Sequence, residues 1–211
     1  MDFTTKTIFF ITLSSLLFVG NAIPSSRDIH VVRHNLQSNL LEFCKKTTNP
    51  TLCQQTIQPS YTNNVFDPYK ALGVEIEATL NQTKKIIGII SELREKQETS
   101  KSLKDSLDIC KDQYNSILGS IKETKDAIAN RDVRTIKFKF SAVLSYQASC
   151  KDAFEGMEKE FAFAKDSDVE YQLGGNCLDI IADLEKSEPK NEDPLPQSPP
   201  SASSNVIGTI S

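Results

Sequence analysis

The fold of this chain is decided by the stretch LKDSLDICKDQYNSILGSIKETKDAI at residues 103–128. Its inward-type residues recur in steps of four and three without a break, which is the period of one face of an α-helix. The pattern therefore predicts a long amphipathic helix that buries one face. The positions on this face are Leu103, Leu107, Cys110, Tyr114, Ile117, Ile121, Thr124 and Ile128.

A second stretch repeats the pattern after a polar break at residues 130–132, where Asp132 suits the N-cap of a new helix. Two matched apolar faces joined by a short polar segment are typical of antiparallel neighbours that pack knobs into holes. The sequence therefore predicts a helical hairpin that turns at residues 130–132. The inward positions of its second helix are Ile136, Phe140, Val143, Gln147, Cys150, Phe154, Met157 and Phe161.

Four more helices are expected from apolar residues at helical spacing. They cover residues 32–46, residues 51–58, a long segment from Asp67-Pro68 to about Lys96, and residues 166–186. Asp followed by Pro is a strong helix start, because Asp caps the first turn and Pro needs no N–H there. In the last helix we expect the inward residues to be Val169, Leu173, Ile180 and Leu184.

Three regions divide the chain. Residues 1–22 are typical of a secretory signal peptide, with Lys6, an apolar run of about a dozen residues, and small residues at Gly20-Asn21-Ala22. That run is shorter than the roughly 20 residues that span a bilayer, so we expect export and no membrane anchor after cleavage. Residues 32–186 form the predicted domain, and residues 187–211 are predicted to be a disordered tail, because their Pro/Ser-rich composition forms no packed core.

The five cysteines predict a disulfide framework, since exported proteins meet an oxidising compartment. Cys110 and Cys150 stand at nearly equal chain distances from the predicted turn, so they are level on facing helices, as disulfide geometry requires. Cys44 and Cys53 flank an Asn-Pro turn signal. Proximity therefore favours these two pairs and leaves Cys177 as a free, buried thiol, although sequence alone allows five choices of the odd cysteine with three pairings each.

Composition and motifs argue against several kinds of chemistry. The 24 Lys and Arg against 28 Asp and Glu provide no concentrated basic face for nucleic acid. His30 and His34 have helical spacing, but they lack the Glu and the third ligand of a zinc site, so we expect no metal. The sequence also lacks a Gly-x-Ser-x-Gly elbow and a phosphate-binding Gly-rich loop. We expect apolar inward positions, no polar pocket, no cofactor and no enzymatic activity.

One site of modification is predicted. Asn81-Gln82-Thr83 is an N-glycosylation sequon on the flank of the long helix. Asn49-Pro50-Thr51 has a similar form, but its proline blocks modification. We therefore expect a glycan at Asn81.

The motifs together closely resemble those of the plant invertase and pectin methylesterase inhibitor family. The resemblance covers about residues 36–186 and rests on the spacing of the cysteines, on two stretches around the third and fourth of them, and on Gly175-Asn176-Cys177-Leu178. The two stretches are LKDSLDICKDQY at 103–114 and FSAVLSYQASCKDAF at 140–154. The resemblance implies an all-α antiparallel four-helix bundle with an N-terminal helical hairpin extension. It also implies two disulfides, first cysteine to second and third to fourth.

The resemblance further implies a secreted, extracellular protein of the apoplast or cell wall that inhibits a carbohydrate enzyme by one-to-one docking over its active-site cleft. Invertase inhibitors of the family carry a Pro-Lys-Phe triplet after the second bundle helix, and here Ile136-Lys137-Phe138 stands instead. Pectin methylesterase inhibitors use helices around the second disulfide, and a small hydroxyl residue, here Ser149, often precedes the fourth cysteine. The implied target is therefore pectin methylesterase, with Arg134, Lys137 and Ser149 at the interface.

Two alternatives stay open at this level. In the first, the target is acid invertase, and a vacuolar location is then also compatible. In the second, the chain is a secreted bundle without inhibitory activity, such as an allergen-like protein or a small-ligand carrier. A carrier would need a cavity lined by phenylalanines at helical spacing, although a packed core explains the same spacing. The free protein is expected to be monomeric. The phenylalanines concerned are Phe138, Phe140, Phe154, Phe161 and Phe163.

Overall fold

The computed structural model describes residues 38–61, 65–97 and 99–188. The predicted signal peptide, the two histidines and nearly all of the predicted tail lie outside these ranges. Within them the chain is helical at residues 38–44, and the later elements are α2 (Pro50–Ile57), the 3-10 turn η1 (Gln58–Ser60), α3 (Pro68–Glu95), α4 (Lys101–Ala129), α5 (Val133–Asp152) and α6 (Ala164–Ser187). None of the helices in this described part is long and apolar enough to cross a membrane.

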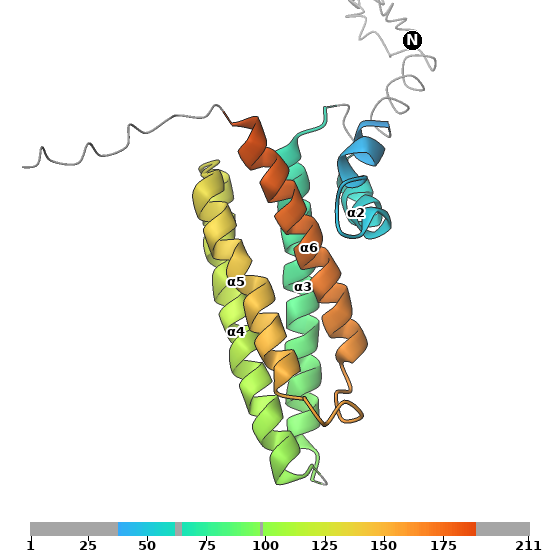
Figure 1. The fold of residues 1–211 in the computed structure, drawn as a ribbon, viewed down its shortest axis with the longest axis vertical. Coiled ribbons are helices and arrows are strands. Elements are labelled where there is room, and N and C mark those ends of the chain that lie inside the picture. The colour runs from blue at the N-terminus through green and yellow to red at the C-terminus, as the bar shows by residue number, and fades with distance from the viewer. Residues whose placement is uncertain (1–37, 62–64, 98, 189–211) are drawn as a thin grey trace, which may run out of the picture.

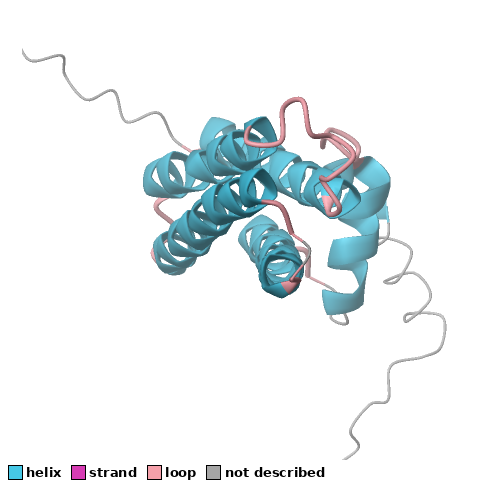
Figure 2. Ribbon diagram, turned by 90° about the horizontal axis from the view of Figure 1, so that it is seen from below, coloured by secondary structure: helices cyan, strands magenta, loops and turns pink. Residues whose placement is uncertain are grey.

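The helices α3 to α6 lie side by side in an elongated antiparallel bundle, and α2 lies on its flank beside α3 and α6 (Figure 1). Seen from below, the bundle helices are viewed nearly end-on, and loops join them at their ends (Figure 2). The predicted all-α four-helix bundle with an N-terminal hairpin extension and two disulfides is therefore confirmed.

The starts of the bundle helices follow from local chemistry. The side chain of Asp67 caps α3 and Pro68 occupies its first turn, as the sequence predicts. Ser100 caps α4, and Asp132 caps α5 by accepting a hydrogen bond from the backbone N–H of Thr135. Each cap satisfies an N–H group that has no partner inside its own helix.

The α4–α5 hairpin forms the best-predicted part of the core. Its turn lies at residues 130–132, where Arg131 takes a positive φ of 53°. All predicted inward positions of α4 from Leu107 to Thr124 are buried, and those of α5 from Ile136 to Cys150 are buried as well. α5 then packs on α6, and α3 closes the bundle by contacting both α4 and α6.

The prediction that α5 continues through Met157 and Phe161 is wrong. α5 ends at Asp152, and residues 153–163 form turns in which Gly156 adopts a φ of 77°. A residue in this left-handed conformation cannot continue an α-helix, and glycine adopts it without steric penalty. Phe154, Phe161 and Phe163 nevertheless remain together, with ring centroids 4.6 to 5.7 Å apart, and they close one end of the bundle.

Two side-chain directions also differ from the sequence prediction. Val169 is 38% exposed, because the inward face of α6 contains Glu170 instead. Phe138 is 73% exposed, so it lines no ligand cavity, whereas Phe140 and Phe163 are fully buried. The expectation of exclusively apolar inward positions is likewise wrong, as the buried polar residues described below show.

Candidate functional site

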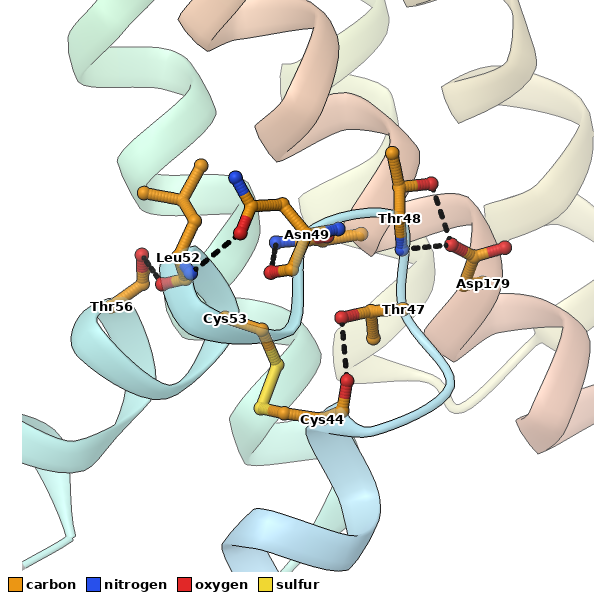
Figure 3. Close-up of a disulfide and its surroundings, with 9 residues drawn as sticks. Cys44, Thr47, Thr48, Asn49, Leu52, Cys53, Thr56 and Asp179 are labelled. Atoms are coloured by element: carbon orange, nitrogen blue, oxygen red, sulfur yellow. Dashed lines mark hydrogen bonds between the residues drawn. A yellow bond between two sulfur atoms is a disulfide. The ribbon is translucent and has the colours of Figure 1, made fainter.

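The N-terminal hairpin is closed by the Cys44–Cys53 disulfide, whose Cα atoms are 5.6 Å apart (Figure 3). Inside this loop, the hydroxyl of Thr47 donates to the carbonyl oxygen of Cys44 at 2.8 Å. The side chain of Asn49 accepts from the backbone N–H of Leu52 at 3.0 Å and so caps α2. Two side chains thus add hydrogen bonds within the loop that the disulfide closes.

The same turn is fastened to α6. One carboxylate oxygen of Asp179 accepts from both the backbone N–H and the hydroxyl of Thr48, each at 2.7 Å (Figure 3). The Asn176 side chain forms two further hydrogen bonds with the backbone of Asn49, and the Asn49 side chain also donates to Gln172. Uncharged and charged polar contacts thus join the turn of the hairpin to α6.

Two glycines make room for these contacts. A Cβ atom on Gly175 would lie 2.6 Å from the hydroxyl oxygen of Thr48, and one on Gly174 would lie 2.6 Å from a methyl group of Leu144 in α5. Real Cβ atoms do not approach this closely. The glycine pair therefore lets α6 approach the hairpin on one side and α5 on the other.

The second disulfide joins Cys110 of α4 to Cys150 of α5, with Cα atoms 4.5 Å apart. Both disulfides agree with the pairing that proximity in the sequence favoured. Cys177 is free and fully buried, with its sulfur 3.8 Å from the hydroxyl oxygen of Thr79. Burial is the main cause of its raised pKa, and the carboxyl group of Glu75 adds to it. The thiolate needed for reactivity is thereby suppressed.

The three predicted interface residues lie along the outside of α5. Arg134 and Lys137 are exposed near its start, and Lys137 pairs with Glu185 at 2.7 Å. Ser149 is exposed near its end, where its hydroxyl donates to the carbonyl oxygen of Ser145 at 3.0 Å. The separation of twelve positions between Lys137 and Ser149 corresponds to about 18 Å of helix. The three residues therefore mark two ends of a long face and do not form one compact patch.

Phe138 is an exposed aromatic residue of this face, and the sequence did not predict it at the interface. It lies four residues after Arg134, so the two side chains emerge on the same side of α5. Between them and Ser149 the exposed positions are small residues, Ser141, Ser145 and Ala148. A signal was present in the sequence, because Phe138 falls two positions from the inward residues Ile136 and Phe140 and hence points away from them. We call the exposed residues Arg134, Lys137, Phe138, Ser141, Ser145, Ala148 and Ser149 the α5 face.

The sequence and the fold both match those of known proteins. The family model for plant invertase/pectin methylesterase inhibitors matches residues 38–180, which is more than half of the chain. The chain belongs to this family. A pectinesterase inhibitor from Actinidia deliciosa is 28% identical over 159 residues, covering 74% of this chain and 80% of the relative. Family and relative alike are described as inhibitors and not as enzymes.

Two solved structures from the family share the fold. A mutant form of a pectin methylesterase inhibitor from Arabidopsis has a TM-score of 0.58 and 18% identity, covering 68% of this chain and 95% of that one. A pectin methylesterase inhibitor from Arabidopsis thaliana has a TM-score of 0.53 and 19% identity, covering 70% and 96%. At these identities the likeness concerns the helical bundle alone.

The buried polar residues of the bundle include two carboxyl groups. Glu75 of α3 and Glu170 of α6 are both 0% exposed. Burial raises the pKa of Glu75 to about 8, and the nearby side chain of Asn176 offsets only part of this effect. Burial also raises the pKa of Glu170 to about 7, opposed by Thr83 and Tyr114. Neither carboxyl group faces a nucleophile in an open cleft, because both are enclosed by packed helices.

Asn81 of the predicted sequon is exposed on α3, beside a shallow groove that Tyr69, Lys70 and Arg131 also line. Thr83, the third residue of the sequon, is fully buried, and its hydroxyl donates to Glu170 at 2.5 Å. The two ends of the sequon therefore have opposite environments. The asparagine can carry a glycan in the folded protein, whereas the threonine is then inaccessible to an enzyme.

Proposed function

We propose that this chain is a secreted protein inhibitor of a plant pectin methylesterase, which it blocks by one-to-one docking over the active-site cleft. The observation that carries the proposal is the 28% identity with a pectinesterase inhibitor across 80% of that relative. The lack of an open catalytic cleft around the buried carboxyl groups is compatible with this role. Inhibition by docking requires no cofactor and no chemistry of the chain itself.

The α5 face is the proposed contact surface. Arg134 and Lys137 supply positive charge at its start, Phe138 supplies an exposed aromatic ring, and Ser149 lies beside the second disulfide at its end. Small residues between these ends leave a surface that a flat partner can approach closely. Aromatic and arginine side chains are enriched among residues that dominate binding energy.

Acid invertase is the second candidate target. The observation in its favour is that Lys137 and Phe138 are adjacent and exposed at the start of α5. These residues correspond to the last two of the Pro-Lys-Phe triplet that invertase inhibitors carry. Ile136 replaces the proline and is fully buried within the helix, which removes that residue from any contact.

One experiment separates these functions. The mature protein is titrated in parallel into a plant pectin methylesterase and a plant acid invertase, and residual activity is measured against molar ratio. We expect loss of methylesterase activity with a break at one inhibitor per enzyme and unchanged invertase activity. Loss of invertase activity alone would establish the second target. No effect on either enzyme would support a bundle of the family without inhibitory activity.

We also propose where the protein acts and which oligomeric state it has. A family of pectin methylesterase inhibitors acts at the cell wall, so we propose secretion to the apoplast after cleavage of residues 1–22, whereas an invertase target would admit the vacuole. The free protein is proposed to be monomeric, and its elution volume in gel filtration tests this.

A glycan at Asn81 is proposed to be attached before the chain folds, because Thr83 is buried afterwards. Digestion with an N-glycosidase should then lower the mass of the secreted protein.

A further inference from the structure

Two carboxyl groups without a basic partner lie inside the interface between α3 and α6. Glu75 and Glu170 are both 0% exposed, and within the described residues neither forms an ion pair with Lys, Arg or His. Both oxygens of Glu75 and one oxygen of Glu170 are buried without a partner in hydrogen-bond geometry. A charged carboxylate is strongly disfavoured in such a place, and the group remains protonated instead.

The surroundings of Glu75 connect it to the N-terminal hairpin. Asn176 and Cys177 of α6 face it, and a charge on Glu75 would raise the pKa of the neighbouring Cys177 thiol. Asn176 is itself fully buried and holds the backbone of Asn49 through two hydrogen bonds. A negative charge on Glu75 would therefore arise directly beside the amide that fastens the hairpin to α6.

The surroundings of Glu170 connect three helices of the bundle. The hydroxyl of Thr83 in α3 donates to it at 2.5 Å, and Tyr114 of α4 faces it. The hydroxyl of Tyr114 also contacts Ser167 at 3.4 Å, and α5 contributes only the uncharged amide of Gln147 to this cluster. Every titratable member is therefore an acid that is neutral only when protonated.

A basic side chain of α3, Lys85, is already engaged with Asp166. The two groups pair at 2.7 Å, which holds the pKa of Asp166 below its ordinary value. Asp166 acts electrostatically on Tyr114, and its negative charge opposes any further negative charge in the cluster. The cluster thus offers no internal compensation when a carboxyl group ionises.

We propose that Glu75 and Glu170 form a pH-sensitive device in the fold: as neutral acids they allow α3 and α6 to pack closely, and their ionisation loosens this interface and releases the hairpin from α6. The direction follows from proton binding. Below the ordinary value of 4.5 both folded and unfolded chains are protonated, and the stabilisation is complete. Between 4.5 and the folded values of about 7 and 8 only the folded chain keeps the protons, so stability falls as the pH rises.

Thermal unfolding of the mature protein tests the device without any target enzyme. The unfolding temperature of the wild type should be more than about 5 °C lower at pH 8 than at pH 5. The reason is that each kcal/mol of lost unfolding free energy lowers this temperature by a few degrees. The double variant Glu75→Gln/Glu170→Gln should show little of this difference, because an amide does not ionise. Glu92→Gln, on an exposed position of α3, should retain the difference of the wild type. Equal pH dependence in the double variant and the wild type would overturn the proposal.

Two measurements on the wild type alone keep the test decisive if the double variant does not fold. Unfolding at pH 6 should release close to two protons per chain, because both carboxyl groups are protonated only in the folded state. Hydrogen exchange, corrected for intrinsic rates, should show lower protection of residues 49–57 at pH 8 than at pH 5. Net proton uptake on unfolding, or a hairpin equally protected at both pH values, would refute the device. Neither result depends on whether the chain inhibits pectin methylesterase.

Discussion

Asn176 of α6 holds the backbone of Asn49 at both of its polar groups, although the two residues are 127 positions apart. Its side-chain oxygen accepts from the Asn49 N–H at 2.7 Å, and its side-chain N–H donates to the Asn49 carbonyl oxygen at 3.2 Å. A side-chain amide offers a donor and an acceptor side by side. One buried side chain thus fixes the position of the hairpin on the bundle.

Asn176→Ala should lower the free energy of unfolding by about 1–3 kcal/mol. It leaves the backbone N–H of Asn49 without a partner and removes one of the two hydrogen bonds that the Asn49 carbonyl oxygen accepts, the other coming from the Cys53 N–H. Urea unfolding followed by circular dichroism measures this change. The matched control is Asn115→Ala, at an exposed position of α4, which should change stability by less than about 0.5 kcal/mol. Equal losses in the two variants would contradict this account of the hairpin contact.

Gly175→Ala should destabilise the protein even though alanine is the better helix former. Its Cβ atom would lie 2.6 Å from the Thr48 hydroxyl oxygen and 2.9 Å from the Thr48 Cβ, so the hairpin must shift. We expect a loss of about 1–3 kcal/mol from this overpacking. Gly88→Ala, in the open on α3, should instead stabilise by up to about 1 kcal/mol. A gain in unfolding temperature for both variants would show that the hairpin adapts freely.

Periodicity predicted the parts of the fold in which local pattern and tertiary packing agree. The α4–α5 hairpin, its turn and its disulfide all follow from one regular apolar face, and Asp67 and Asp132 are the caps that the sequence indicates. The end of α5 could not be found in this way, since Met157 and Phe161 maintain helical spacing beyond the true end at Asp152. Those residues keep the period because they cover the end of the same core.

The candidate site was predicted less well, for two physical reasons. The apolar period of a helix constrains only its inward positions. Phe138 was assigned to the core because it is hydrophobic, although it lies on the side of α5 opposite the apolar face. Inward polar residues break the pattern that periodicity detects, so Glu75, Glu170 and Asn176 were all missed. A charged residue at an inward position of an otherwise apolar helix is the signal that would have revealed the first two.

Cys177 should be unreactive in the folded protein. Burial raises its pKa, and the sulfur is enclosed between α3 and α6. A thiol reagent such as Ellman's reagent should therefore label no residue of the described domain before unfolding and one thiol per chain in denaturant without reductant. Mass spectrometry of the labelled peptide should locate the label at Cys177. Two or more labelled thiols would contradict the two disulfides.

Removal of the long disulfide should destabilise the bundle more than removal of the free thiol. The Cys110–Cys150 bridge closes a loop with a sequence separation of 40, for which the chain-entropy model gives about 4 kcal/mol. Cys110→Ala/Cys150→Ala should therefore unfold at a much lower urea concentration than Cys177→Ala, which loses one small buried side chain. Similar midpoints for the two variants would show that the bridge adds little to the packing of α4 on α5.

Phe138→Ala separates binding from folding on the α5 face. The ring is 73% exposed, so its loss should leave the unfolding temperature nearly unchanged. If the α5 face contacts pectin methylesterase, the inhibition constant should rise at least about tenfold, since an exposed aromatic ring becomes fully desolvated only in the complex. Val65→Ala, at a site 79% exposed ahead of α3, should leave the inhibition constant unchanged.

Ser149, at the opposite end of the α5 face from Phe138, tests how far the contact with the enzyme extends along α5. Ser149 lies about 18 Å along the helix from Lys137, so Ser149→Arg introduces bulk and charge without disturbing the start of α5. A complex that covers the whole α5 face should be weakened by both Phe138→Ala and Ser149→Arg, each measured by enzyme titration. Weakening by Phe138→Ala alone would confine the contact to the start of α5, where Lys137 and Phe138 also correspond to the invertase-type triplet. Because Ser149 adjoins Cys150 and its disulfide, weakening by Ser149→Arg would place the second disulfide within the contact.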